Sequence, residues 1–238
     1  MHIGILKTDH IYPSLAARHG EYPAMFMRLL RSVSPSLVFS IYDVVRGDMP
    51  GSLNDADAWL ITGSKSGVYE NKPWIGRLLQ LTQALHEHRK PVIGICFGHQ
   101  LLAQALGGRV EKSSHGWGVG VQEYTLAKAA HWMQPATPTL CLIASHQDQV
   151  IALPPGAQLL AGNTFCPNAM YTIGEHILGI QAHPEFSPAY ARDLIEYRHD
   201  TIDIELVQQA LDSLTTPTDN QLVARWLLAF TRKAAANV

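Results

Sequence analysis

One cysteine in this sequence occupies a setting that favours nucleophilic chemistry. Cys96 is the middle residue of the segment Gly-Ile-Cys-Phe-Gly, which joins an apolar, strand-like run to a helical pattern. A glycine two residues to either side allows the chain to turn sharply and to project the middle side chain outward, as in a nucleophile elbow. The free amides and the positive dipole end of the following helix favour a thiolate. The sequence therefore predicts that Cys96 is a nucleophile, whereas Cys141 and Cys166 lack this setting and are interpreted as ordinary thiols.

A histidine and a glutamate at the end of a second strand-like run can complete the chemistry. A thiolate that attacks an amide needs a proton donor for the departing nitrogen, and histidine usually serves near neutral pH. The proline between His183 and Glu185 keeps the histidine extended, and residues two apart in extended chain point to the same side. Glu185 can then bind one ring nitrogen while the other faces Cys96, which predicts a triad of Cys96, His183 and Glu185. Among the other histidines, His99 should point away from the elbow, and His146 is the alternative base.

The elements that must position these residues are visible in the hydrophobic pattern of the chain. Strand-like runs alternate with helical patterns in the first two thirds, which favours a mostly parallel sheet with helices on both faces. The predicted strands lie at residues 3–6, 37–45, 58–61, 91–96 and 177–182, and the predicted helices include 24–31 and 75–88. Further short β-like segments predict an antiparallel extension of the sheet, at residues 118–126, 139–144 and 157–161.

The chain of 238 residues is expected to form a single α/β domain, residues 1–238. We predict a core over about residues 1–187 and a C-terminal helical extension over residues 188–238. Two or three helices are expected in this extension, and the last is predicted at residues 221–236, where apolar side chains recur one turn apart.

Composition and charge narrow the class of partner. The formal net charge is −2, from 18 Lys and Arg against 20 Asp and Glu, and no run of like charges occurs, so nucleic acid is not an expected partner. No apolar stretch reaches the length of a membrane span and the first residues lack signal-peptide features, which predicts a cytoplasmic protein with a small-molecule substrate. The three cysteines are widely spaced and the 12 histidines are scattered, so neither a disulfide framework nor a metal site is expected. No nucleotide-binding glycine loop is present, and no cofactor is predicted.

The two motifs together resemble those of a known family. From residue 58 to residue 186, with Gly-Ile-Cys96-Phe-Gly-His-Gln and His183-Pro-Glu185, the chain resembles the class I (triad-type) glutamine amidotransferases. The resemblance implies a flavodoxin-like fold, and attack of Cys96 on the side-chain amide of glutamine to form a γ-glutamyl thioester that water then hydrolyses. It also implies that the backbone amides of Gly63 and Phe97 form the oxyanion hole.

Further residues are assigned through the resemblance. The residues that would grip the α-amino and α-carboxylate groups of the substrate are Gln100, Gly116, Trp117, Ser145, His146 and Asp148. The loop Gly63-Ser64-Lys65 differs from the Gly-Gly-Pro of many members and looks closer to the stand-alone branch that includes γ-glutamyl peptidases than to the guanylate-synthase glutaminase domain. The length leaves no room for a synthetase domain, so any ammonia acceptor is expected to be a separate synthetase chain.

Several functions stay open at this point. The first is hydrolysis of glutamine itself, and an alternative is hydrolysis of γ-glutamyl peptides such as glutathione-like compounds. A glutaminase subunit that works only when docked onto a synthetase is another. A non-hydrolytic reactive-cysteine protein, such as a redox sensor or a chaperone, would explain the elbow around Cys96 but not Glu185.

Overall fold

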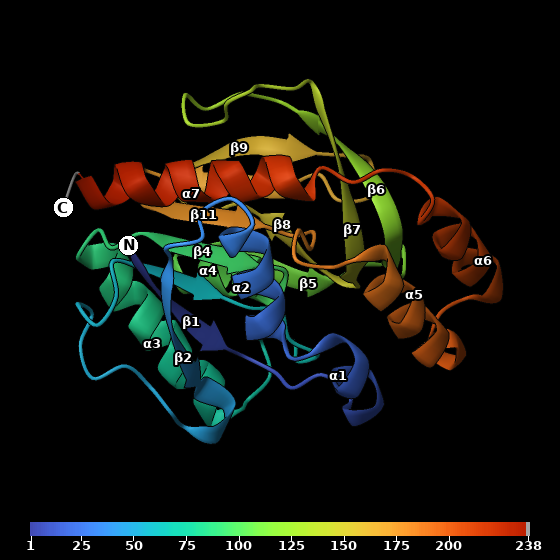
Figure 1. Ribbon diagram of the computed structural model, residues 1–238, viewed down its shortest axis with the longest axis horizontal. Coiled ribbons are helices and arrows are strands. Elements are labelled where there is room, and N and C mark those ends of the chain that lie inside the picture. Colours follow the sequence, from blue (N-terminus) through green and yellow to red (C-terminus); the bar gives the residue numbers. More distant parts are fainter. Residues whose placement is uncertain (237–238) are drawn as a thin grey trace.

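The computed structural model describes residues 1–236, whose strands form a nine-stranded sheet and a separate two-stranded sheet (Figure 1). In spatial order, the large sheet contains β2 (Val38–Asp43), β1 (His2–Lys7), β3 (Ala58–Ile61), β4 (Val92–Ile95), β11 (Ile177–Ile180), β10 (Met170–Ile173), β9 (Ala157–Gly162), β6 (Gly118–Leu126) and β7 (Thr139–His146). The small sheet pairs β5 (Arg109–Lys112) with β8 (Asp148–Ala152).

The large sheet has a parallel half and an antiparallel half. Strands β2, β1, β3, β4 and β11 are parallel neighbours, whereas β10, β9, β6 and β7 join them by antiparallel pairing. The strands β3, β4 and β11 are buried along their whole length, as expected for parallel strands covered on both faces. The predicted flavodoxin-like α/β fold with an antiparallel extension is therefore confirmed.

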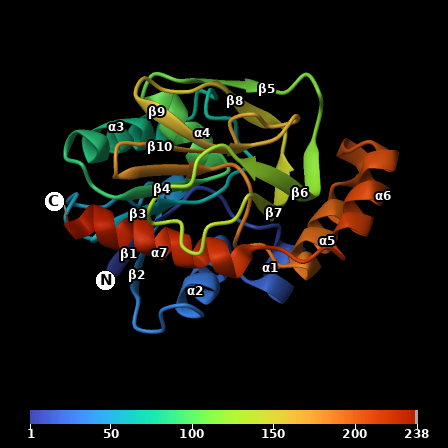
Figure 2. The same cartoon turned by 90° about the horizontal axis from the view of Figure 1, so that it is seen from above.

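Helices cover both faces of the parallel half, as predicted. The helices are α1 (Pro13–His19), α2 (Tyr22–Arg31), α3 (Pro73–Glu87), α4 (Phe97–Ala105), α5 (Pro188–Tyr197), α6 (Ile204–Ser213) and α7 (Asn220–Ala236). Helices α2 and α7 pack into one apolar cluster against the sheet, and α3 and α4 pack into another on the opposite face (Figure 2). Helices α1, α5 and α6 share a third cluster, at the end of the sheet where β6 and β7 lie.

Some boundaries differ from the predictions. The strand predicted over residues 37–45 ends at Asp43, because the chain turns there into a short 3-10 helix, Val44–Arg46. The strands predicted to reach residues 96 and 182 end earlier, at Ile95 and Ile180. Helix α1 and the strands β5, β8 and β10 were not predicted. Helix α1 has only 7 residues, and β5 has the sequence Arg-Val-Glu-Lys, which contains no apolar run.

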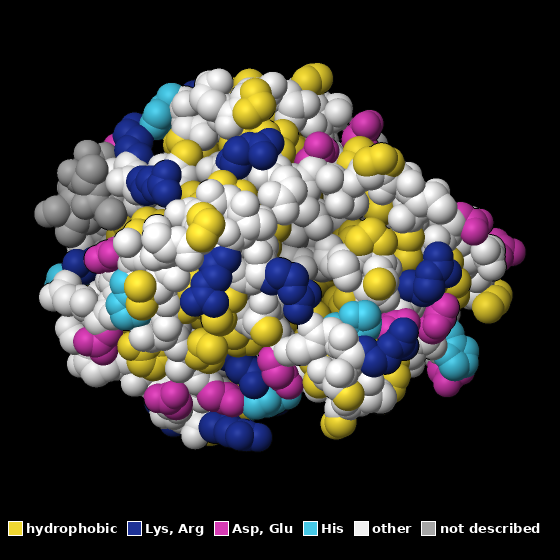
Figure 3. Space-filling view, viewed as in Figure 1, with side chains coloured by type: hydrophobic (Ala, Val, Ile, Leu, Met, Phe, Trp, Pro, Cys, Tyr) yellow, Lys and Arg dark blue, Asp and Glu magenta, His cyan; other side chains and the backbone are white. Residues whose placement is uncertain are grey.

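The surface carries charges of both signs. On the face in Figure 3, Lys and Arg side chains are scattered among acidic, apolar and uncharged ones, and no large patch of one sign gathers among the residues drawn in colour. Within residues 1–236, no helix is both long enough and apolar enough to cross a membrane.

The turn between β4 and α4 depends on close backbone packing. A Cβ atom on Gly98 would lie 2.5 Å from the carbonyl oxygen of Ile61, and a Cβ atom on Gly94 would overlap the backbone of Gly98. Because these neighbours are backbone atoms, no side-chain rotation relieves the overlap. The glycines flanking Cys96 therefore allow α4 to lie directly against β3 and β4.

We expect Gly98→Ala to lower the free energy of unfolding by about 1–3 kcal/mol, because the added methyl group overpacks the contact with β3. Denaturant unfolding of the purified protein measures this change. Gly76→Ala is a matched control, since a Cβ atom there meets nothing within 4 Å on the exposed side of α3. That control should gain roughly 0.5–1 kcal/mol through helix propensity. Equal stability of Gly98→Ala and the wild type would contradict the packing argument.

Candidate active site

Cys96 lies at the corner between β4 and α4, where the sequence predicts it. Its backbone angles are φ 53° and ψ −101°, an uncommon conformation for a residue with a side chain. Two backbone hydrogen bonds hold it: the amide donates to Ile180 at 2.8 Å, and the carbonyl accepts from the amide of Gln100 at 3.1 Å. Strain of this kind persists only where the surroundings enforce it, and it is concentrated at functional sites. The side chain is thereby presented at the N-terminus of α4.

His183 and Glu185 follow β11, the strand next to β4. The Nδ1 atom of His183 and the Oε1 atom of Glu185 are 2.8 Å apart, and both side chains are buried. The amide of His183 donates to the carbonyl of Ile143 on β7 at 2.8 Å, and its ring stacks on Phe186 with centroids 3.9 Å apart. These contacts fix the ring, and the bond at Nδ1 leaves Nε2 as the nitrogen available for chemistry.

The imidazole of His183 lies beside Cys96, and Gly63 lies against both. A Cβ atom on Gly63 would be 3.0 Å from Cε1 of His183 and 3.6 Å from Cβ of Cys96. Burial disfavours the charged ring, but the carboxylate of Glu185 and the sulfur of Cys96 outweigh it and raise the pKa of His183 to about 10. The ring is therefore protonated near neutral pH and can act as a proton donor.

The other two histidines considered for this role lack such partners. His146 lines the same cleft, but its Nδ1 atom lies 3.1 Å from the carbonyl oxygen of Asp148, and burial lowers its pKa to about 4. His99 is fully buried on α4, and burial lowers its pKa to about 3. Neither ring has a carboxylate partner among the described residues, so His183 is the better candidate.

A cleft of about 440 Å³ opens above Cys96. Most of the predicted site residues line it: Cys96, Gln100, Trp117, Ser145, His146, Asp148 and His183. Gly116 is not among the lining residues, and Glu185 lies behind His183. Other lining residues were not predicted from the sequence, because they come from α2, β5, α5 and loops and belong to no recognisable motif: Tyr12, Tyr22, Tyr69, Glu70, Lys112, Tyr197 and Arg198.

The cleft also contains polar and charged side chains from α4, β5 and β8. The side-chain nitrogen of Gln100 donates to the carbonyl of Asp148 at 2.9 Å and to Oε1 of Gln181 at 3.1 Å, so both of its protons are used within the protein and only its oxygen remains for a ligand. Lys112 is the cross-strand partner of Asp148 between β5 and β8. The cleft thus contains a cation and an anion on neighbouring strands. Burial raises the pKa of Asp148, and the charge of Lys112 opposes this increase.

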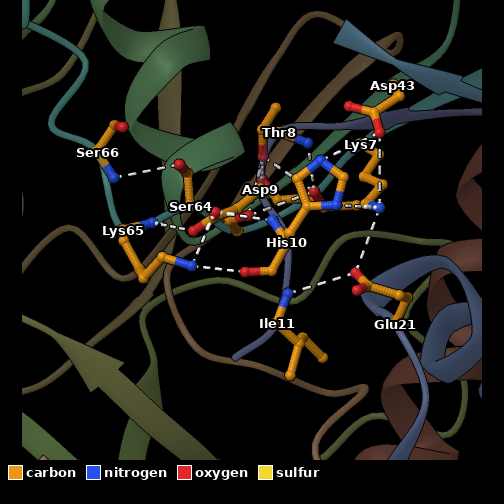
Figure 4. A network of polar contacts seen from close by, with 12 residues as sticks. Lys7, Thr8, Asp9, His10, Ile11, Glu21, Asp43, Ser64, Lys65 and Ser66 are labelled. Carbon is orange, nitrogen blue, oxygen red and sulfur yellow. Dashed lines mark hydrogen bonds and ion pairs between the residues drawn. The ribbon is translucent and has the colours of Figure 1, made fainter. Parts of the chain in front are cut away.

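The loop after β3, which contains Gly63, is held by the residues that follow β1 (Figure 4). The Thr8 hydroxyl donates to the carbonyl of Gly63 at 2.9 Å, and the Asp9 carboxylate accepts from the Lys65 amide at 2.7 Å. The Lys65 ammonium pairs with the other oxygen of Asp9 at 2.9 Å and donates to the carbonyl of His10. Because β1 and β3 are parallel neighbours, their carboxyl ends meet here. In the sequence, the polar pair Thr8-Asp9 directly after the first strand was the feature that could have predicted this contact.

Comparison with known proteins identifies the family. Residues 40–197 match the profile described as glutamine amidotransferase class-I. The chain belongs to this family. As a class I glutamine amidotransferase, it is 32% identical over 178 residues to γ-glutamyl peptidase 5 of Arabidopsis thaliana, covering 72% of this chain and 70% of that protein. It is also 30% identical over 169 residues to one subunit of the glutamine-hydrolysing GMP synthase of Halobacterium salinarum, covering 70% and 85%.

Solved structures show that the amidotransferase fold extends over the whole chain. A glutamine amidotransferase from Thermotoga maritima superposes with a TM-score of 0.76 at 19% identity, covering 100% of both chains. One from Methylobacillus flagellatus gives a TM-score of 0.77 at 22% identity, covering 98% of this chain and 94% of that one. In this amidotransferase, no three His, Cys, Asp or Glu side chains of the described residues are grouped in a way that could hold a metal ion.

Proposed function

We propose that this protein hydrolyses γ-glutamyl amides by covalent catalysis, with Cys96 as nucleophile, His183 as acid and base, and Glu185 as the residue that orients His183. The observation that carries the proposal is the 2.8 Å bond between Glu185 and Nδ1 of a buried His183 that lies beside a cysteine in an enforced, strained turn. This arrangement combines a nucleophile, a base and an orienting carboxylate, which acyl transfer requires.

The first half of the reaction forms a thioester. The Cys96 thiolate attacks the carbonyl carbon of the γ-amide, and the oxygen takes up negative charge near the amides of Gly63 and Phe97. At the start of α4, the first amides have no acceptor within the helix, so Phe97 can donate to this oxyanion. The carbon–nitrogen bond then breaks as Nε2 of His183 gives its proton to the departing nitrogen.

The second half uses the same residues in reverse. Once the sulfur of Cys96 is acylated, it carries no negative charge, so its contribution to the raised pKa of His183 is lost. The neutral ring can then accept a proton from water as the water oxygen attacks the thioester carbon. Glutamate leaves, and the thiolate and the protonated ring are restored.

Two features favour γ-glutamyl peptides as substrates, with glutamine as the simplest γ-glutamyl amide. The cleft continues past His183 to Tyr12 and to α5, so it offers room for a leaving group larger than ammonia. A relative that covers 72% of this chain is named a γ-glutamyl peptidase.

A second candidate function is a glutaminase subunit that supplies ammonia to a separate synthetase chain. It is favoured by the 30% identity to the GMP synthase subunit of Halobacterium salinarum. In that case, hydrolysis would need the partner, and Cys96 would still react with a glutamine-like alkylating agent in the isolated protein.

A substrate panel tests the proposal. We expect the purified protein to release glutamate from both glutamine and γ-glutamyl dipeptides, with the larger kcat/KM for dipeptides because the cleft extends beyond the scissile bond. Free glutamate and ammonia are measured for each substrate. If no substrate yields glutamate while the alkylating agent still labels Cys96, the role as a partner-dependent glutaminase becomes the better account.

A further inference from the structure

The cleft extends past the imidazole of His183 to a wall formed by α5 and by the residue before α1. Arg198, which caps the C-terminus of α5, belongs to this wall together with Tyr12 and Tyr197. These residues lie far from the triad in sequence and have no part in the chemistry proposed above. They are therefore candidates for contact with the part of the substrate that leaves.

Arg198 is held in place by uncharged groups only. Its Nη1 atom donates to the hydroxyl of Ser145 at 3.1 Å. Its guanidinium carbon lies 5.9 Å from the ring centroid of Tyr12 and 5.7 Å from that of Trp117, and Tyr12 itself stacks on Tyr197 at 4.1 Å. A guanidinium that contacts two aromatic rings and donates to a hydroxyl is oriented before a ligand arrives, which reduces the entropy lost on binding.

Arg198 differs from the other cations in the cleft. Lys65 is paired with Asp9 at 2.9 Å, and Lys112 is an exposed side chain opposite Asp148 that no aromatic ring or hydrogen bond of the described residues orients. No carboxylate of the described residues lies at ion-pair distance from Arg198, and Ser145 alone among them accepts a side-chain hydrogen bond from it. A cation that is oriented but not neutralised is suited to bind an anionic ligand group.

Arg198 lies near the aromatic residues that stack on His183. Phe186 stacks on the ring of His183, and Tyr22 stacks on Phe186 at 6.3 Å. Burial raises the pKa of the Tyr22 phenol, and Arg198 is near enough to oppose this increase. In the proposed mechanism the departing nitrogen takes its proton from His183, which puts a group attached to that nitrogen within reach of this wall.

We propose that Arg198 binds a carboxylate on the departing amine, so that the preferred substrates are γ-glutamyl amino acids and short γ-glutamyl peptides. This inference rests on the proposed hydrolytic function and adds to it a residue that determines specificity. Asp148 and Lys112 then remain for the α-amino and α-carboxylate groups of the glutamyl part. Ser145 and Trp117, which contact Arg198, are reassigned to the side of the leaving group, where Arg198 binds the second carboxylate.

The test compares γ-glutamylglycine with γ-glutamylglycinamide, which differ only in whether the leaving amine carries a carboxylate or a neutral carboxamide. We expect the wild type to prefer γ-glutamylglycine by roughly tenfold or more in kcat/KM, as a charge-assisted hydrogen bond implies. Arg198→Met should reduce kcat/KM for γ-glutamylglycine by roughly tenfold and leave that for the glycinamide within about twofold. Arg192→Met, at an exposed position on α5, is the matched control and should change neither.

Two results would overturn the inference. One is a wild type with no preference between the two compounds, and the other is an Arg198→Met variant that loses the same factor on both. If the wild type hydrolyses neither compound, the hydrolytic function fails, and calorimetric binding to the Cys96→Ser variant decides the role of Arg198 separately. Tighter binding of γ-glutamylglycine that disappears with Arg198→Met supports it, and equal binding of both compounds refutes it.

Discussion

Replacing Cys96 with alanine is expected to lower kcat for glutamate release by about ten-thousand-fold or more, because no other described group can form the thioester. Glutamate released from γ-glutamylglycine over long incubations measures this loss. The alanine methyl group occupies the same strained backbone position as the thiol carbon, so the variant should fold.

Cys141→Ala is the matched control for this experiment. Cys141 is partly exposed on β7, and burial raises the pKa of its thiol, so it is a poor nucleophile. Its substitution should leave kcat within about twofold. A folded Cys96→Ala variant that hydrolyses the substrate at the wild-type rate would rule out covalent catalysis by this residue.

Replacing Glu185 with glutamine is expected to lower kcat by roughly a hundredfold to ten-thousand-fold, since the orienting partner of His183 loses its charge while its size is kept. The pH profile should change as well. The carboxylate helps to raise the pKa of His183 to about 10. In the proposed mechanism the acid form of the ring is the active one in thioester formation. Without the carboxylate the pKa falls, so kcat/KM should begin to decline at a lower pH on the alkaline side.

Glu196→Gln, on the exposed side of α5, is the control with the same change of charge. It should leave the pH profile of kcat/KM unchanged. The alternative of a non-hydrolytic reactive-cysteine protein makes the opposite prediction for Glu185. It requires that thiol reactivity and its pH dependence stay the same when Glu185 becomes glutamine, because such a protein needs no oriented proton donor.

The parts of the site that the sequence predicted have local signals. The tight corner at Cys96 needs a glycine on each side, and a segment of five residues, 94–98, is enough to show both glycines. The proline and the two-residue spacing placed His183 and Glu185 on one side of the chain, and the structure has them bonded. The strands at residues 58–61 and 118–126 were predicted with their observed bounds, because their apolar runs are flanked by clear breaks.

The parts that were missed depend on contacts between distant segments. Asp9 holds the loop of Lys65 only because β1 and β3 are neighbours, an adjacency that no local pattern reveals. Arg198 reaches the cleft because α5 packs across the end of the sheet, and a lone arginine after an amphipathic helix is typical of an ordinary surface residue. Such residues become visible only when the tertiary arrangement is known.

The adjacency of β4 and β11 has a consequence for the chain during its synthesis. The thiol leaves the ribosome with β4, whereas the imidazole follows much later with β11, which must insert between β4 and β10. Non-local parallel pairing of this kind forms slowly, and nascent domains complete such sheets only after the last strand emerges. In the proposed mechanism, an unfinished or truncated chain therefore carries a thiol without its proton donor, and amide cleavage begins only when the sheet is complete.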